Sequence, residues 1–508
     1  MSDHPALFVR EMHVTWRDTF TISHTVPYRD FLAGARERLS GLPMALGDSF
    51  TPRRQQPRLL WMAERVSKGV AGIGHPNLLR VQFEPLEIAP LPHSIATQMR
   101  DPARIPAQMI LEAGAEADAD GTWIHIDPLL VLHRARAGVM TYHTRFALPD
   151  PGYSPREAIE RVRMGIGTGL VRVPTTWRAA LPDDLTGWPI AQVVDSGGGL
   201  YLLVGSPRDL TQSAIAAHLA SPPASGRRRR RPVLEAVIPP RPTGSTSVVL
   251  TETDPLPDAD YDAFIDVYGP ELRGIGALDA FYTERAPWVV EQELHQNLSS
   301  DAEAALYLLG NSELILFNRD GRQVLQDMRD RHHLPDLDHA AIYWANHYSI
   351  LMDWVYIQDA ILRTYIQRLD AMASSPEPQR RDLIAVLQGA LSDLVPYSEG
   401  ITPFSTRINF LEAASRFHKI DNLTERFERK QALLLSYTAE YHDFRDARAS
   451  EFLNQLAGVL AAFELAALLT AGLGLTLTEQ PLEFIGVVAG SVLLVYVVIA
   501  VLLRAARR

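Results

Sequence analysis

The sequence LAGVLAAFELAALLTAGLGL occupies residues 456–475, and FIGVVAGSVLLVYVVIAVLL follows it at 484–503. Twenty residues of α-helix measure about 30 Å, which is the hydrocarbon thickness of a bilayer. The two stretches therefore predict two transmembrane helices, joined by a short outer loop at 476–483. The basic tail at 504–508 is typical of a cytoplasmic flank. We expect a multi-pass protein of the cell (inner) membrane, with the lipid bilayer as a partner and both termini in the cytoplasm.

A long helix is predicted immediately before the first span. Residues 404–457 contain neither glycine nor proline, so the segment 402–455 is predicted to form a helical stalk. Ile420, Phe427, Leu434 and Tyr441 recur at every seventh residue along it, as in a coiled coil. This seam predicts a homo-oligomer in which the stalks of several subunits form a bundle. The alternative is a stripe that packs on the chain's own helices, which the sequence predicts as a pair at 339–400.

This order of elements resembles the CorA family of divalent-cation transporters. In that family a large cytosolic region leads through a long helix into two spans that are joined by a very short outer loop. The family's Gly-Met-Asn signature corresponds here to Gly-Leu-Thr, with Gly474 first and Thr476 last, and Pro481 keeps the spacing of the family's proline. The outer loop also holds Glu479 and Glu483, the latter one residue beyond the family's acid. Thr476 stands in place of the asparagine and has a shorter, less polar side chain.

The resemblance covers roughly the last third of the chain. It implies a homopentamer that conducts magnesium or another divalent cation and is gated by its cytosolic domain, with Gly474 and Thr476 bordering the ion pathway. Such a channel is the leading hypothesis. The alternative is a membrane-anchored sensor or effector that keeps this scaffold without ordinary magnesium transport, and the missing asparagine favours it. The sequence specifies neither the ion nor the gating ligand.

Glu464 lies in the middle of the first predicted span, where an unpaired charge costs about 2.5 to 3.5 kcal/mol. Its helical face carries Ala457, Ala461, Ala467 and Ala471, all of them small. Small residues let helices approach closely or leave room for a narrow aqueous path. Because rings of carboxylates select cations in pores, Glu464 and its alanine neighbours are predicted to line an ion pathway. The alternative is a protonated Glu464 that bonds to a neighbouring helix.

A dense group of potential metal ligands precedes the predicted helical pair. It consists of His332, His333, Asp336 and Asp338. Imidazole and carboxylate groups are common ligands of transition metals. The spacing matches no known metal motif, however, and the aspartates also suit the first turn of a helix. The alternative is therefore a polar entrance to the helix that follows.

The rest of the chain predicts an α+β cytosolic region. It comprises an N-terminal α/β domain at 1–220, a Pro/Arg-rich linker at 221–245 and a second α/β segment at 246–338. The linker contains five consecutive arginines at 227–231, which either form an exposed loop or bind anionic headgroups or phosphate. Expected strands lie at 6–16, 129–133, 139–146, 190–194, 200–204, 247–251 and 314–317, and expected helices at 154–164, 261–268 and 302–309. The role of residues 1–220 is not specified.

The composition narrows the functional classes. The length of 508 residues predicts two or three domains, and the formal charge of -11 disfavours nucleic acid as a partner while it is compatible with cations. The sequence has no cysteine, which excludes disulfides, thiolate metal sites and cysteine nucleophiles. It also lacks phosphate-loop, nucleophile-elbow and dinucleotide motifs, so we do not expect an enzyme. No signal-peptide pattern is present at the start.

Overall fold

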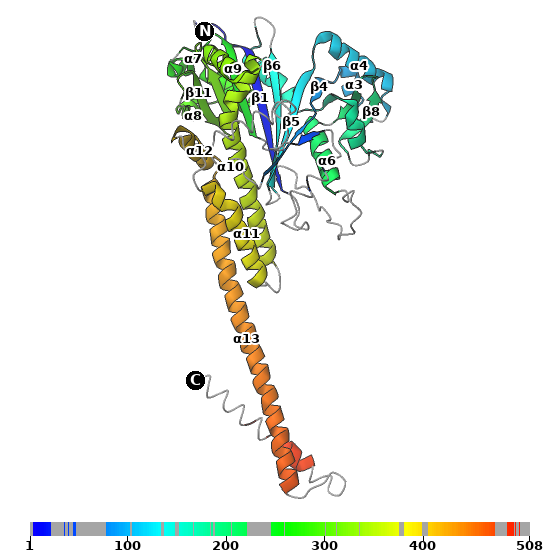
Figure 1. Cartoon of the computed structure of the whole chain (residues 1–508), viewed down its shortest axis with the longest axis vertical. Helices are drawn as coiled ribbons and strands as arrows, with labels where there is room; N and C mark the ends of the chain where they lie inside the picture. Colours follow the sequence, from blue (N-terminus) through cyan, green and yellow to red (C-terminus); the bar gives the residue numbers. More distant parts are fainter. Residues whose placement is uncertain are drawn as a thin grey trace. The chain divides into compact units, whose positions relative to one another are not determined.

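The structure is a computed structural model of the chain (Figure 1). It describes residues 4–21, 35, 39, 44–46, 78–101, 104–133, 137–147, 152–165, 167–182, 184–185, 188–204, 206–220, 245–258, 260–299, 301–310, 312–334, 336–374, 380–398, 405–472, 485–491, 493 and 497. The chain divides into two compact units. The first comprises Met1–Arg368 and Leu387–Phe427, and the second comprises Leu369–Val386 and Glu428–Arg508.

A twelve-stranded sheet forms the centre of the first unit. Its order is β11-β12-β10-β1-β6-β5-β4-β7-β9-β8, with β3 on β5 and β2 on β3. Among the described strands, β10 and β12 pair in parallel and the other pairs are antiparallel. The strands are β1 (Phe8–Thr21), β2 (Met44–Leu46), β3 (Leu78–Phe83), β4 (Leu86–Pro90), β5 (Ile124–His133), β6 (Ala137–Ala147), β7 (Gly169–Val173), β8 (Ile190–Asp195), β9 (Leu200–Val204), β10 (Ser245–Asp254), β11 (Ala304–Leu309) and β12 (Ser312–Phe317).

Strand β1 lies in the interior of this sheet, next to β6 in Figure 1, and its other neighbour is β10. Successive side chains of a strand point to opposite faces, and β1 uses both faces. Met12, Val14 and Trp16 are buried in the hydrophobic core on one face. Arg17 points to the other face, where it is buried as well. Because β10 follows the predicted linker in the chain, residues from 1–220 and from 246–338 share one sheet.

Three helices cover the face of the sheet that carries the even-numbered residues of β1. They are α5 (Pro155–Gly165), α6 (Pro207–Ala220) and α7 (Tyr261–Ala277), and each contributes apolar residues to the core. Helix α5 begins as the sequence predicts, because Ser154 Oγ and Ser154 N both donate to the carboxylate of Glu157. The remaining helices of the sheet region are α3 (His93–Ala96), α4 (Ala107–Asp120), α8 (Pro287–Leu294) and α9 (Gly321–His332), with 3-10 turns η4 (Thr175–Ala180) and η5 (Tyr282–Glu284).

The opposite face of β10 and β12 is covered by α10 (Leu337–Ala373). Phe317 of β12 and Trp344 of α10 pack edge to face, with ring centroids 4.9 Å apart. Two further helices pack on α10 within the first unit. Tyr365 donates a hydrogen bond of 2.6 Å to Asp393 of α11 (Arg380–Ser398). The second is α12 (Ser405–Phe417), whose Phe410 packs edge to face on Tyr348 of α10. Helix α13 (Ile420–Gly472) follows α12 in the chain.

The predicted stalk at 402–455 is interrupted between α12 and α13. Lys419 adopts a left-handed backbone with φ of 57°, and His418 N donates to Ala414 O at 2.9 Å as α12 ends. A left-handed residue other than glycine costs about 1 to 2 kcal/mol, so the surrounding contacts must stabilise this break. A segment without glycine and proline can therefore still contain a break between two helices.

The prediction of two membrane spans is wrong for the part of the chain that the structure describes. No helix in that part is both long enough and apolar enough to cross a bilayer. Residues 456–472 of the first predicted span instead end α13, a helix of 53 residues that begins in a charged segment and carries Glu464. Twenty apolar residues have the length of a span, but a continuous apolar run does not by itself distinguish a membrane helix from other helices. The multi-pass inner-membrane location with cytoplasmic termini and the channel architecture are corrected accordingly.

The predicted fold class is corrected at the same time. In place of an α+β cytosolic region attached to a stalk and two membrane helices, the structure is a mixed α/β protein built on one extended sheet. A smaller error concerns 302–309, where the sequence predicts a helix and the structure has β11. All six residues of β11 are buried. A short apolar run that is buried on every side has no periodicity that separates helix from strand.

Candidate functional site

The structure describes only part of the predicted ion pathway. Glu464 is an exposed residue of α13. Ala457, Ala461 and Ala471 lie on the same helix. Gly474, Thr476, Glu479, Pro481 and Glu483 lie outside the described residues. The structure therefore does not test the predicted pathway.

The predicted metal ligands next to α10 form a helix entrance instead. Asp336 Oδ1 accepts a hydrogen bond of 2.8 Å from His339 N, which is the contact of a capping residue. The His332 ring packs against the Tyr343 ring in a tilted arrangement, with ring centroids 4.8 Å apart, and His333 is exposed. Across the described ranges no group of three or more histidine or acidic side chains could hold a metal ion. These contacts favour the polar entrance that the sequence left open, although the side chain of Asp338 lies outside the description.

The stalk seam is largely covered by the chain itself. Ile420, Phe427 and Leu434 are buried, and Tyr441 is partly buried. Phe427 packs against the Tyr365 ring at a centroid distance of 6.4 Å. This burial favours packing on the chain's own helices over packing on other subunits for the first three positions. Self-association as a pentamer stays a prediction.

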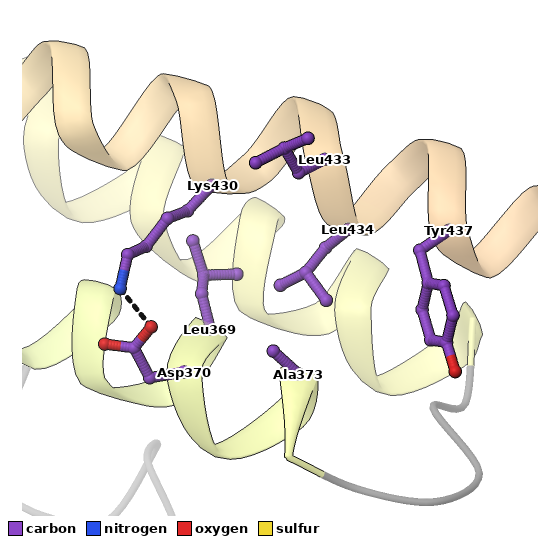
Figure 2. A pocket seen from close by; sticks show the side chains of 7 residues that line it. All are labelled: Leu369, Asp370, Ala373, Lys430, Leu433, Leu434 and Tyr437. Carbon is purple, nitrogen blue, oxygen red and sulfur yellow. Dashed lines mark hydrogen bonds and ion pairs between the residues drawn. The ribbon is translucent and has the colours of Figure 1, made fainter.

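In the second unit, Leu434 lines a cavity of about 250 Å³ between α13 and the last turns of α10. Figure 2 shows Leu369 and Ala373 on the α10 side and Leu434 and Tyr437 on the α13 side. Lys430, which lies between Phe427 and Leu434 in the sequence, forms an ion pair with Asp370 at the edge of this cavity (Figure 2). This charged residue of α13 thus has a partner on α10.

The most unusual side chain of the molecule is Arg17 in the middle of β1. It is 1% exposed, although its guanidinium carries a permanent charge. Its Nε donates to Asp353 Oδ1 of α10 at 2.8 Å, and its Nη1 donates to Glu313 Oε1 of β12 at 3.3 Å. Ser247 Oγ of β10 donates to the other Glu313 oxygen at 3.0 Å. Three strands and a long helix therefore meet at one buried ion network.

The charges of this network stabilise one another. Burial raises the pKa of Glu313, and the Arg17 guanidinium opposes that rise. Burial by itself would lower the pKa of Arg17, but Glu313 and Asp353 outweigh it, so the pKa of Arg17 is raised. Arg17 stays charged and needs its carboxylate partners, because an unpaired buried charge costs several kcal/mol.

The network continues along α10 to the end of α12. Tyr356 lies three residues after Asp353, and its Oη is 3.2 Å from His418 Nε2. The two rings also pack edge to face, with centroids 4.8 Å apart. Burial lowers the pKa of His418 to about 4, against a smaller opposing effect of Asp359, so this imidazole is neutral at pH 7. We call the following residues the Arg17 cluster: Arg17, Ser247, Glu313, Asp353, Tyr356 and His418.

A second buried pair lies on the other face of β1. Asp18 is 2% exposed and forms an ion pair with Arg208 of α6. Gln212 of the same helix donates to Asp18 Oδ2 at 3.2 Å. Burial raises the pKa of Asp18 to about 6, more than Arg208 lowers it. Consecutive residues of β1 thus connect the sheet to helices on both of its faces.

The Arg17 cluster does not have the properties of a catalytic centre. The side chains of Arg17 and Glu313 are fully buried, so a substrate would not reach them. What the arrangement can do is hold α10 and the end of α12 in one position on the sheet. The sequence analysis missed it, although one signal was available: Glu313 is the only charged residue in the strand SELILF. A carboxylate within such an apolar run requires a buried partner.

Comparisons with known proteins add no family to this description. No protein-family model matches the sequence, and no curated protein matches it. The resemblance to CorA transporters therefore stays a prediction from the sequence.

Proposed function

We propose that this protein is a sensor or effector in which the sheet of the first unit controls the helices that pack on it. The controlled helices are α10, α12 and the first turns of α13. The Arg17 cluster is the observation that carries the proposal, because it connects β1, β10 and β12 to α10 and α12 through buried polar contacts.

Buried ion networks are sensitive to small displacements. Arg17 donates one hydrogen bond of 3.3 Å to Glu313 of β12 and another of 2.8 Å to Asp353 of α10. A shift of β12 against β1 would weaken the bond to Glu313 and leave a buried charge partly unpaired. Breaking such a pair costs about 3 to 5 kcal/mol, so helix and sheet should rearrange together rather than separately. This is the coupling that a sensor requires.

Hydrogen exchange measured by mass spectrometry tests this proposal. Glu313→Gln removes the charge opposite Arg17 and nearly keeps the shape of the side chain. We expect faster amide exchange at both ends of the cluster, in α10 around Asp353 and in α12 before His418, because the two segments share the network. The matched control is Arg322→Gln, which removes the exposed ion pair between Arg322 of α9 and Glu252 of β10. If only the residues next to position 313 change in exchange, the cluster is a local structural contact and the proposal fails.

Conduction of divalent cations stays a prediction from the resemblance. Its pathway residues Gly474 and Thr476 lie outside the described residues. The features of the structure that we describe favour the sensor or effector over transport.

A further inference from the structure

A cavity of about 410 Å³ lies beside the first residues of β10 and β12. Three arginines from separate segments line it: Arg163 from α5, Arg273 from α7 and Arg285, which follows η5. Thr246 of β10 and Ser312 of β12 also line it. The strands pair Thr246 with Ser312, and the next pair, Ser247 with Glu313, belongs to the Arg17 cluster. Because neighbouring residues of a strand face opposite ways, the cavity and the cluster lie on opposite faces of the same two strands.

Asp279 fixes two of the three guanidinium groups. Its Oδ2 accepts 2.9 Å from Arg273 Nη1 and 2.7 Å from Arg285 Nε. Burial by itself would raise the pKa of Asp279, but the hydrogen bonds from Arg285, from the Phe281 backbone and from Arg273 lower it overall. The carboxylate is therefore ionised at neutral pH and orients both arginines before any ligand arrives. Such preorganisation reduces the entropic cost of binding.

Many donors at the cavity have no partner among the residues that the structure describes. Arg273 also donates from Nε to Glu293 at 2.8 Å, and Arg163 donates from Nη2 to the Leu278 carbonyl at 2.6 Å. Each guanidinium has five N–H groups, and these bonds occupy one or two of them per arginine among the described residues. Three arginines and one aspartate give the lining a formal charge of +2, part of which is offset by Glu293, paired with Arg273, and by Glu284, next to Arg285. The cavity thus offers positive charge and free donors to an anion.

We propose that this cavity binds a small organic molecule through its phosphate group. Guanidinium groups that come from three directions suit a tetrahedral phosphate, which presents at least three charged or polar oxygens, better than a planar carboxylate with two. The hydroxyl groups of Thr246 and Ser312 are suitable additional partners. The cavity volume lies in the range of about 300 to 1,000 Å³ that is usual for organic ligands, so the phosphate is one part of a larger molecule.

The position of the cavity gives this ligand a regulatory role, and this part of the inference rests on the proposed function. A phosphate held by Arg163 of α5 and Arg273 of α7 would also accept hydrogen bonds from Thr246 and Ser312. These bonds would shift the first residues of β10 and β12 toward the ligand. Ser247 and Glu313 are the next residues of these strands. Occupancy should therefore change the position of Glu313 relative to Arg17 and be transmitted to α10.

Calorimetric titration of the full chain tests the binding step, with inorganic phosphate, phenyl phosphate and benzoate as probes. We expect both phosphates to bind, the phenyl ester more tightly, and benzoate to bind at least about tenfold more weakly than phenyl phosphate. Arg163→Gln and Arg285→Gln should each weaken phosphate binding by about tenfold or more, because a charge-assisted hydrogen bond is lost. Arg156→Gln is the control, since Arg156 is an exposed residue of α5 that pairs with Glu160. Equal affinity of the wild type and both cavity variants, or tighter binding of benzoate than of phenyl phosphate, would overturn the site.

Hydrogen exchange with and without phenyl phosphate tests the transmission step separately. We expect the ligand to change exchange in α10 near Asp353 in the wild type, and this change to be lost in Glu313→Gln while phenyl phosphate still binds that variant. Binding without any change in α10 would keep the phosphate site and overturn its regulatory role. Failure of the proposed function is thereby distinguished from failure of the binding site.

Discussion

Arg17 and Asp18 are adjacent in β1 and point to opposite faces of the sheet, yet their ion pairs differ in kind. Arg17 has a permanent charge and two carboxylate partners, and its side chain is fully buried. Asp18 can lose its charge by protonation, and its partner Arg208 is 24% exposed. The guanidinium of Arg17 therefore keeps its charge through moderate changes of pH, whereas the Asp18 carboxyl, with a pKa of about 6, changes its charge. The two ion pairs thus differ in the number of partners, in solvent exposure and in which of the two β1 side chains titrates.

The largest expected effect is the loss of stability on removal of the Arg17 charge. Arg17→Met leaves Glu313 buried without its cation and should lower the free energy of unfolding by about 3 to 5 kcal/mol. The matched variant Arg208→Met, on the other face, should cost clearly less, because Arg208 is 24% exposed whereas the side chains of Arg17 and Glu313 are fully buried. Urea denaturation of both variants measures the two losses. Equal losses would mean that the two faces of β1 are energetically alike.

The next effect is a change in the pH dependence of stability. The pKa of Asp18 is raised to about 6 in the folded state. Its contribution to stability is thus fully present below its unfolded pKa of 3.8 and is lost as the pH rises through about 6. The size of this loss is on the order of 2 to 3 kcal/mol at most, at about 1.4 kcal/mol per unit of pKa difference. His418 acts in the opposite direction, because its pKa is lowered to about 4 and its contribution is lost as the pH falls from 6.5.

These two contributions partly cancel in the wild type, so variants should separate them. Asp18→Asn should be more stable at neutral pH than at about pH 4.5, because the variant loses the opposing contribution of Asp18 and keeps that of His418. His418→Gln should show the reverse slope. Unfolding free energies of both variants at the two pH values provide the measurement. The same slope in both variants would contradict the opposite signs that we assign to these groups.

The smallest expected effect concerns an exposed pair in the second unit. Lys430→Gln removes the ion pair with Asp370, whose carboxylate is 51% exposed. Exposed pairs contribute about 0 to 1 kcal/mol, and we expect a change of unfolding free energy within that range, reduced further by salt. A loss comparable to that of Arg17→Met would show that exposure does not separate the two classes of ion pair in this protein.

Much of the sheet could be predicted from local patterns. The alternation of 6–16 predicted β1, and the turns between apolar runs predicted the β5–β6 and β8–β9 hairpins, which the strand pairings confirm. The Ser154 cap of α5 is confirmed as well. In each case the pattern lies within a few residues, so the sequence contains the whole signal. The assignment of 302–309 failed because an all-buried strand shows no alternation.

The Arg17 cluster could not be predicted in the same way. Its members lie at positions 17, 247, 313, 353, 356 and 418, and no local pattern relates them. Only the sheet order places β1 beside β10 and β10 beside β12. The candidate membrane spans show a further difficulty: an apolar run gives the length of a helix, but the surroundings of that helix are not encoded within the run.

The sheet order also has a consequence for how this protein is made. Strand β1 leaves the ribosome before its neighbours β6 and β10, which are encoded roughly 120 and 240 residues later. At about 5 to 20 residues per second, β1 waits on the order of 10 to 50 s before its second edge can be paired. During that time the strand exposes unpaired backbone N–H and C=O groups, which can pair with strands of other chains. Arg17 and Asp18 place two charges in this unpaired segment, and charges disfavour pairing between exposed strands of different chains. We therefore expect the residues that later connect the sheet to its helices to reduce aggregation of the nascent chain.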